Sequence, residues 1–187
     1  MSLFPDNLRV RPNAEFAFFE MSYAFGRSAG SVFTSLAKAA SESAFRFLVI
    51  EPDPIEYYEK SFGQAADLVF STSSDTAAIY ANLMAAWPLG SPADAPRFRA
   101  DIVSWSSPSG LWWGWGEREF NLCAIGTDDR DLLDVAIDSM ALQGIPSFTT
   151  EGVLANIVSL EIPDQDRLKS FGARLVSTLG YGRTRSI

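Results

Sequence analysis

The sequence predicts an α+β domain in which helices flank a central β-sheet that is antiparallel or mixed. Two observations carry this prediction. The aromatic stretch at residues 102–126 contains the residue types and the turn expected of neighbouring strands. Other segments repeat apolar residues at the three- and four-residue spacing of amphipathic helices. From the length of 187 residues we expect a single domain, spanning 14–187, behind an N-terminal arm at 1–13.

The aromatic stretch predicts three consecutive strands. It reads IVSWSSPSGLWWGWGEREFNLCAIG and holds four of the five tryptophans together with the only cysteine, Cys123. Pro108 presets φ for a turn and Gly110 can adopt positive φ, so the polar segment that begins at Ser106 is expected to reverse the chain. Strands are therefore expected near 98–106, 111–117 and 120–126.

The tryptophans of this stretch are expected mainly in the core. Trp105 and at least one of Trp112 and Trp113 should be buried, because neighbouring residues on a strand face opposite sides of the sheet. The alternative is that one or two tryptophans form an exposed aromatic contact patch. Gly114 and Gly116 weaken an isolated strand, so they predict either a bulge or a close approach of the backbone to another group.

Strands and helices are expected to alternate before the aromatic stretch. Segment 14–25 is apolar but follows neither period cleanly, so it is predicted as either a helix or a strand. Proline, glycine and serine residues predict an internal loop near 88–96. The other predictions are strands at 45–50 and 67–72, and helices at 31–40, 54–62 and 76–86, the last capped by Asp75.

A long amphipathic helix is predicted after the aromatic stretch, from a cap at Thr127 or Asp128 to about residue 142. Apolar residues recur there at helical spacing, while Asp131, Asp134 and Asp138 share the opposite face. Two further segments follow, 153–160 as a strand or a helix, and 164–179 as a final helix.

Composition excludes several classes of function. The net charge of −8 is unfavourable for binding the phosphates of nucleic acid. Histidine is absent, which excludes Ser-His-Asp triads, Cys-His pairs and histidine-based zinc sites. One cysteine cannot form an internal disulfide, and we find neither a signal peptide nor a membrane-spanning stretch, so we expect a cytoplasmic chain without membrane partners. No motif predicts a cofactor, although carboxylates alone could support an enzyme or hold magnesium or calcium.

Carboxylates are densest at the end of the aromatic stretch and just after it. This acidic group comprises Glu117, Glu119, Asp128, Asp129, Asp131, Asp134 and Asp138, offset by Arg118 and Arg130. The simplest interpretation is a solvated face, with some carboxylates favouring a helix N-terminus. A second is a docking surface for a basic partner. A third is an acid–base pair of Glu117 and Glu119, which would share a strand face at their two-residue spacing.

Residues 104–127 resemble part of a known family. The sequence Trp113-Gly114-x-Gly116-x-Arg118, followed by an apolar strand and an acidic helix, is similar to the tryptophan–glycine strand pair of small bacterial immunity proteins. Those proteins neutralise toxins that neighbouring cells exchange. The resemblance implies an acidic, cytosolic, cofactor-free α+β protein that acts in interbacterial competition. It transfers no individual binding residue.

We therefore expect a non-enzymatic protein that binds a basic partner, and the resemblance makes a toxin domain the expected partner. Tight interfaces combine aromatic anchors with charge complementarity, and this part of the chain has both residue types. The alternative is a carboxylate-dependent hydrolase or transferase that uses Glu117 and Glu119. The expected partner-binding residues are Glu117, Glu119, Asp128, Asp131, Asp134, Asp138, Trp112 and Trp115.

Overall fold

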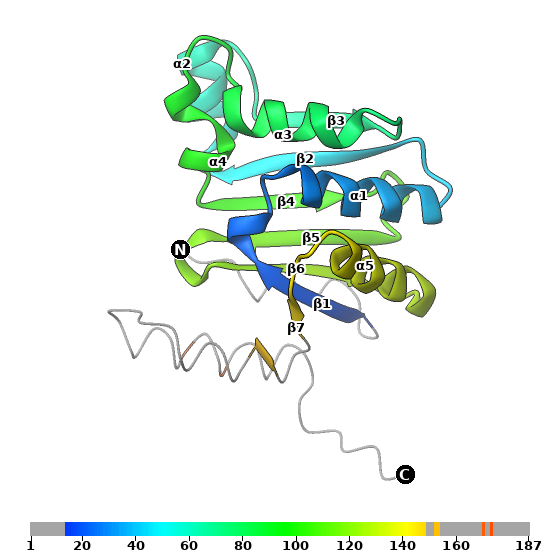
Figure 1. The fold of residues 1–187 in the computed structure, drawn as a ribbon. Coiled ribbons are helices and arrows are strands. Elements are labelled where there is room, and N and C mark those ends of the chain that lie inside the picture. The colour runs from blue at the N-terminus through cyan, green and yellow to red at the C-terminus, as the bar shows by residue number, and fades with distance from the viewer. Residues whose placement is uncertain (1–13, 149–151, 154–169, 171–172, 174–187) are drawn as a thin grey trace, which may run out of the picture.

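The computed structural model describes residues 14–148, 152–153, 170 and 173, and most of them belong to one α+β domain (Figure 1). Its seven strands form a sheet of order β3-β2-β4-β5-β6-β1-β7, in which every pair of neighbours is antiparallel. The predicted fold class is confirmed. The strands are β1 (Glu15–Glu20), β2 (Ala44–Glu51), β3 (Asp67–Ser71), β4 (Ile102–Ser106), β5 (Trp112–Glu117), β6 (Leu122–Thr127) and β7 (Ser147–Phe148).

Three helices cover one face of the sheet, which we call the front face; the opposite face is the back face. They are α1 (Arg27–Ala39), α3 (Thr76–Ala86) and α5 (Arg130–Leu142), and α1 lies between the other two (Figure 1). None of the helices in the described part of the chain has the length and apolar character needed to cross a bilayer. The short elements are η2 (Met21–Tyr23), η3 (Pro54–Glu59, a π-helix that continues into α2, Lys60–Phe62), η4 (Pro92–Asp94), α4 (Pro96–Arg99) and η5 (Arg118–Phe120).

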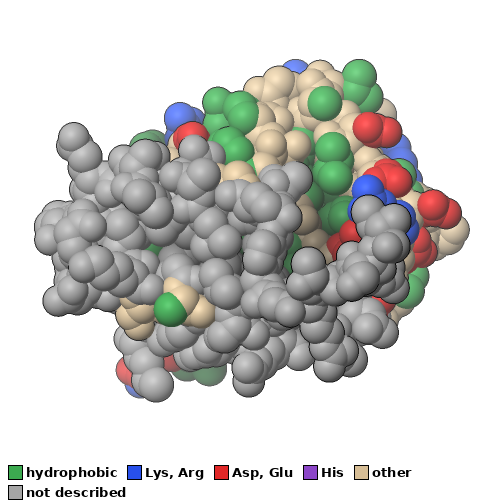
Figure 2. Space-filling view, turned by 90° about the horizontal axis from the view of Figure 1, so that it is seen from below, with side chains coloured by type: hydrophobic (Ala, Val, Ile, Leu, Met, Phe, Trp, Pro, Cys, Tyr) green, Lys and Arg blue, Asp and Glu red, His purple; other side chains and the backbone are tan. Residues whose placement is uncertain are grey.

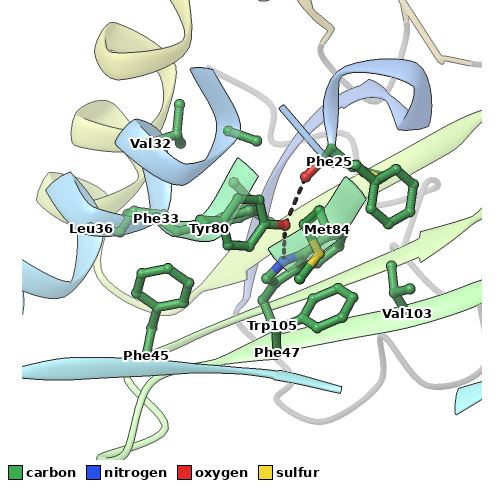
Figure 3. Packing of buried hydrophobic residues seen from close by; sticks show 14 of the residues in the cluster. Phe25, Val32, Phe33, Leu36, Phe45, Phe47, Tyr80, Met84, Val103 and Trp105 are labelled. Atoms are coloured by element: carbon green, nitrogen blue, oxygen red, sulfur yellow. Dashed lines mark hydrogen bonds between the residues drawn. The ribbon is translucent and has the colours of Figure 1, made fainter. Parts of the chain in front are cut away.

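The front face carries an aromatic core. The Phe33 ring of α1 stacks on the Trp105 ring of β4 with their centroids 4.9 Å apart. The buried Trp105 Nε1–H donates to the Tyr80 hydroxyl at 3.0 Å, and this hydroxyl donates to the Ala24 carbonyl at 2.7 Å (Figure 3). Burial raises the pKa of Tyr80, so the hydroxyl stays protonated and keeps donating. The two hydrogen bonds join β4, α3 and the segment after β1.

Gly114 and Gly116 of β5 make room for the front-face core. A Cβ at Gly114 would lie 3.0 Å from Trp105 Cε3, and a Cβ at Gly116 would lie 2.8 Å from Cys123 Sγ. Strand β5 keeps continuous register with both neighbours, so the glycines mark a close approach and not a bulge. Trp105 and Trp112 are both buried, as predicted from the sequence.

The back face has two unlike halves. Over β5, β6 and β1 it carries a second buried apolar cluster, which includes Trp115. Over β2 and β3 it carries a bidentate ion pair between Arg46 and Asp67, next to an exposed Val69. The buried members of the cluster are Phe18, Ile102, Trp115, Phe120, Leu122, Ala124 and Val153.

Several strand boundaries differ from the sequence-based prediction. The ambiguous segment 14–25 forms β1 followed by the η2 turn. Strand β4 begins at Ile102 and not near residue 98, because Pro96 opens the helical turn α4. The third predicted strand begins at Leu122, after the η5 turn and an Asn121 with a φ of 44°.

The helix predictions are mostly confirmed in position, with corrections at their starts. Helix α1 begins at Arg27 and not at residue 31, so Gly30 lies within it. The missing side chain of Gly30 lets α3 approach, because a Cβ there would lie 3.0 Å from Ala77 Cα. Asp75 occupies the N-cap position of α3, but its side chain makes no capping hydrogen bond.

Some predictions fall largely outside the described residues. The N-terminal arm at 1–13 lies outside them entirely. Of the segments predicted at 153–160 and 164–179, the structure describes Val153, Ser170 and Ala173, and all three are helical.

Candidate protein-binding surface

The N-terminus of α5 is held by a side-chain cap. The Asp129 carboxylate accepts hydrogen bonds from the backbone N–H groups of Asp131, at 2.9 Å, and Leu132, at 3.4 Å. The sequence pattern placed this cap at Thr127 or Asp128, which is wrong by one or two residues. Thr127 supports the cap instead, because its hydroxyl accepts the Asp129 N–H at 3.0 Å. A capped first turn fixes where the helix begins and which side it exposes.

Helix α5 presents a row of exposed carboxylates. Asp131, Asp134 and Asp138 are three and four residues apart, so they project from the same side of the helix. The opposite side is buried against the front face through Leu132, Leu133, Ala136 and Met140. We call Asp128, Asp131, Asp134 and Asp138 together the acidic face. Because buried residues from Leu132 to Met140 pack α5 against the sheet, the acidic face is presented in a fixed geometry.

Arg130 ties the acidic face to β1. Its Nη1 lies 2.7 Å from Glu15 Oε2 and its Nε lies 3.1 Å from Asp134 Oδ1. Hydrogen bonds to Glu15 and Asp134 raise the pKa of Arg130 above its ordinary value. In the view of Figure 2, acidic and basic side chains gather together at the right-hand side of the molecule. The side chains of Arg130, Glu15 and Asp134 are all more than half exposed, so these two ion pairs contribute little to stability.

The two predicted glutamates lie at the other end of β6. Glu117 pairs with Leu122 at the start of β6, whereas Asp128 follows Thr127 at its end. A strand of this length separates its ends by about 17 Å at roughly 3.4 Å per residue. Glu117 and Glu119 therefore do not continue the acidic face along one edge, contrary to the expectation from sequence.

Glu117 and Glu119 also do not share a strand face. Strand β5 ends at Glu117, and Glu119 lies in the η5 turn. The Glu117 side chain is 3% exposed and lies among the buried residues of the back face, while Glu119 is exposed to solvent. Glu117 and Glu119 therefore do not form the acid–base pair on one strand face that their two-residue spacing predicted.

The two tryptophans named as anchors are inside the domain. Trp112 is fully buried on the front face, and Trp115 is 8% exposed on the back face. Alternation along β5 sends them to opposite faces, because their positions differ by three, an odd number. Neither ring is accessible to a partner protein while this domain is folded. The interpretation of Trp112 as a core residue is confirmed.

The structure adds a residue that the sequence analysis missed. Leu142, the last residue of α5, is 83% exposed. It follows Asp138 by four residues, so it extends the row of Asp131, Asp134 and Asp138 by one turn. The signal was present in the sequence as an apolar residue on the acidic side of the helix. An exposed leucine beside carboxylates can serve as an apolar anchor at an interface.

Comparison with known proteins finds no match to a protein family, a curated protein or a solved structure. Among the residues that the structure describes, no three cysteine, aspartate or glutamate side chains converge as ligands for a metal ion.

What the geometry offers at this surface is a rigid helix with a row of carboxylates and one exposed leucine. Such a surface is suited to binding a basic, partly apolar partner.

Proposed function

We propose that this chain is a non-enzymatic protein that binds a basic partner protein through the acidic face and Leu142 of α5. The observation that carries the proposal is the exposed row of Asp131, Asp134 and Asp138 on a capped and packed helix. From residue 128 to residue 142 the chain has five aspartates and a single cation, Arg130. A surface of this charge accelerates encounter with a basic protein and disfavours acidic competitors.

The proposed partner is a toxin domain, which makes this chain an immunity protein acting in the cytoplasm. Support comes from the resemblance of residues 104–127 to the tryptophan–glycine strand pair of small bacterial immunity proteins. Nuclease toxins are basic because their substrates are polyanions, so an acidic inhibitor is their electrostatic complement. The hydrolase alternative has less support, because Glu117 and Glu119 do not flank a common site on one strand face.

The proposal is tested by reversing the charge of the acidic face. The probe is the basic protein that the wild-type chain captures from its native cells, identified by mass spectrometry and then purified. Asp131, Asp134 and Asp138 are changed together to lysine, and association is followed by stopped-flow fluorescence at several salt concentrations. We expect the association rate constant to fall at least about tenfold at low salt, because long-range attraction is lost, and the effect to shrink as salt is added.

A matched variant separates the effect of the charges on α5 from the effect of the net charge of the chain. Glu51, Glu56 and Glu59 are also exposed, and they lie on and just after β2, away from α5. Changing these three to lysine alters the net charge by the same amount and should slow association much less. A Leu142→Lys variant should mainly speed dissociation, because it removes a short-range contact. If the α5 triple variant associates as fast as the wild-type chain, the partner binds elsewhere.

A further inference from the structure

Strand β3 is an edge strand of the sheet, and the backbone groups of every second residue face away from its neighbour β2. The Thr72 N–H donates to the Ser43 carbonyl at 2.8 Å, and the Val49 N–H donates to the Ala66 carbonyl at 2.9 Å. These bonds mark the hydrogen-bonded pairs of an antiparallel ladder, which recur at every second residue. Residues 66, 68, 70 and 72 therefore face β2. Asp67, Val69 and Ser71 direct their backbone groups away from it.

This edge carries few of the features that protect edge strands from pairing. Its sequence is DLVFS, without proline or lysine, and it keeps regular register with β2 over its whole length. Asp67 is its one charged residue, and that charge is engaged by Arg46. At the centre of the edge, Val69 is 69% exposed. A regular, exposed and mostly uncharged edge is a template for another strand.

The helix beside this edge is also uncharged. Helix α3 has no charged residue in its sequence, TAAIYANLMAA, and it lies in front of β3 (Figure 1). Ala77 faces α1, because a Cβ at Gly30 would lie 3.0 Å from Ala77 Cα. Ile79 follows two residues later and is turned by about 200° around the helix axis. It therefore points away from α1, toward the outer side of the edge, and it is 48% exposed.

We propose that β3 pairs antiparallel with β3 of a second copy of this chain, about a two-fold axis at Val69. In this register Val69 lies opposite Val69 of the second copy, and Asp67 lies opposite Ser71, so no like charges meet. The outward backbone groups of Asp67, Val69 and Ser71 form the new ladder. The same axis brings the Ile79 side of α3 against its counterpart. One strand edge alone is a small interface, and the uncharged helix enlarges it.

The dimer leaves the acidic face accessible. Strand β3 is at one edge of the sheet, whereas α5 packs against β1 and β6 toward the other. Two acidic faces would therefore point outward, and the dimer would be bivalent toward a partner. The dimer does not depend on the function proposed for α5, and either proposal can fail without the other.

The first test measures the mass of the full chain in solution by sedimentation equilibrium over a range of concentrations. The wild-type chain should approach twice the 20.5 kDa of one copy as concentration rises. Val69→Lys places two cations opposite each other at the axis, and Ile79→Lys does the same on the helix layer. Each should raise the dimer dissociation constant at least about tenfold. Circular dichroism checks that each variant keeps the fold.

Leu142→Lys is the matched control, because it also places a lysine at an exposed apolar position, but on α5. It should leave the dimer unchanged while it weakens partner binding. A wild-type chain that remains monomeric at every concentration overturns the proposal. So does a dimer that survives both Val69→Lys and Ile79→Lys, because its interface must lie elsewhere.

Cross-linking tests the register directly. Facing residues of a hydrogen-bonded antiparallel pair have Cα atoms about 5.5 Å apart, within the range that a disulfide spans. Val69→Cys should therefore form a covalent dimer under mild oxidation, and Leu142→Cys should not. The native Cys123 is fully buried and does not compete. Equal cross-linking of the two variants would show that their contacts are random collisions and would overturn the pairing at Val69.

Discussion

The two faces of the sheet are built from the same strands, but they are packed differently. On the front face, three helices cover rings that stack closely, and a buried chain of hydrogen bonds crosses the core from Trp105 through Tyr80. On the back face, buried residues near Trp115 give way to an exposed ion pair and Val69 over β2 and β3. The difference shows that sequence alternation supplies apolar residues to both faces, while the packing above each face decides how tightly they are held.

The first prediction compares one tryptophan from each face and carries the largest expected effect. Trp105→Ala empties a fully buried site and removes the donor to Tyr80, so it should lower the free energy of unfolding by about 3–5 kcal/mol. Trp113 on the back face is half-buried, and Trp113→Ala should cost about 1–2 kcal/mol. Urea denaturation measures both. Equal losses would contradict the view that the front face is the tighter core.

The second prediction compares glycines that face opposite sides of the sheet. A Cβ at Gly116 would meet Cys123 Sγ at 2.8 Å and Val103 Cγ2 at 3.0 Å, both fixed in the front core. Gly116→Ala should therefore destabilise the fold by about 1–3 kcal/mol.

At Gly126, on the back face, a Cβ would meet the Phe16 and Trp113 rings at 2.7 and 2.8 Å. These two rings are half-buried and can shift, so Gly126→Ala should cost less than Gly116→Ala. The midpoint of thermal unfolding ranks the two variants. A larger loss at Gly126 would mean that the back-face rings are held as firmly as the front core.

The smallest expected effect concerns pH and the ion pair of the back face. A hydrogen bond from Arg46 lowers the pKa of Asp67 in the folded state. A lowered carboxyl pKa adds stability above the unfolded value of about 3.9, and that stability is lost as pH falls through the folded value. Asp67→Asn should therefore be less stable than wild type by under about 1 kcal/mol at pH 7, because the pair is exposed.

The same comparison should be made in acid. As pH falls below about 4, the difference between wild type and Asp67→Asn should begin to shrink, and it should disappear once pH is below the lowered pKa of Asp67 in the folded state. Trp105→Ala provides the front-face reference. The loss of stability that it causes should change little over this pH range, because the indole ring of Trp105 has no titrating carboxylate among its buried contacts. Urea denaturation at each pH measures both differences. A difference at Asp67 that persists in acid would show that the amide disturbs packing and not the ion pair.

Much of the fold was predictable because its signals are local. Alternation along a strand predicted that Trp105 and at least one of Trp112 and Trp113 are buried, and the glycines of β5 predicted either a bulge or the close approach that the structure shows. Helical spacing placed Asp131, Asp134 and Asp138 on the exposed side of α5. Element ends were less accurate, since a one-turn helix such as α4 or η5 depends on few residues.

The arrangement of the candidate site was decided by tertiary structure. The sequence places Glu117 eleven positions before Asp128, yet β6 holds them at opposite ends of a strand, and the back face buries Glu117. The sequence alone determined which residues share a face of one element, because backbone geometry repeats at fixed periods. Which faces are covered, and which elements become neighbours, depends on pairings such as β1 with β6 between residues about a hundred positions apart, and no local period encodes them.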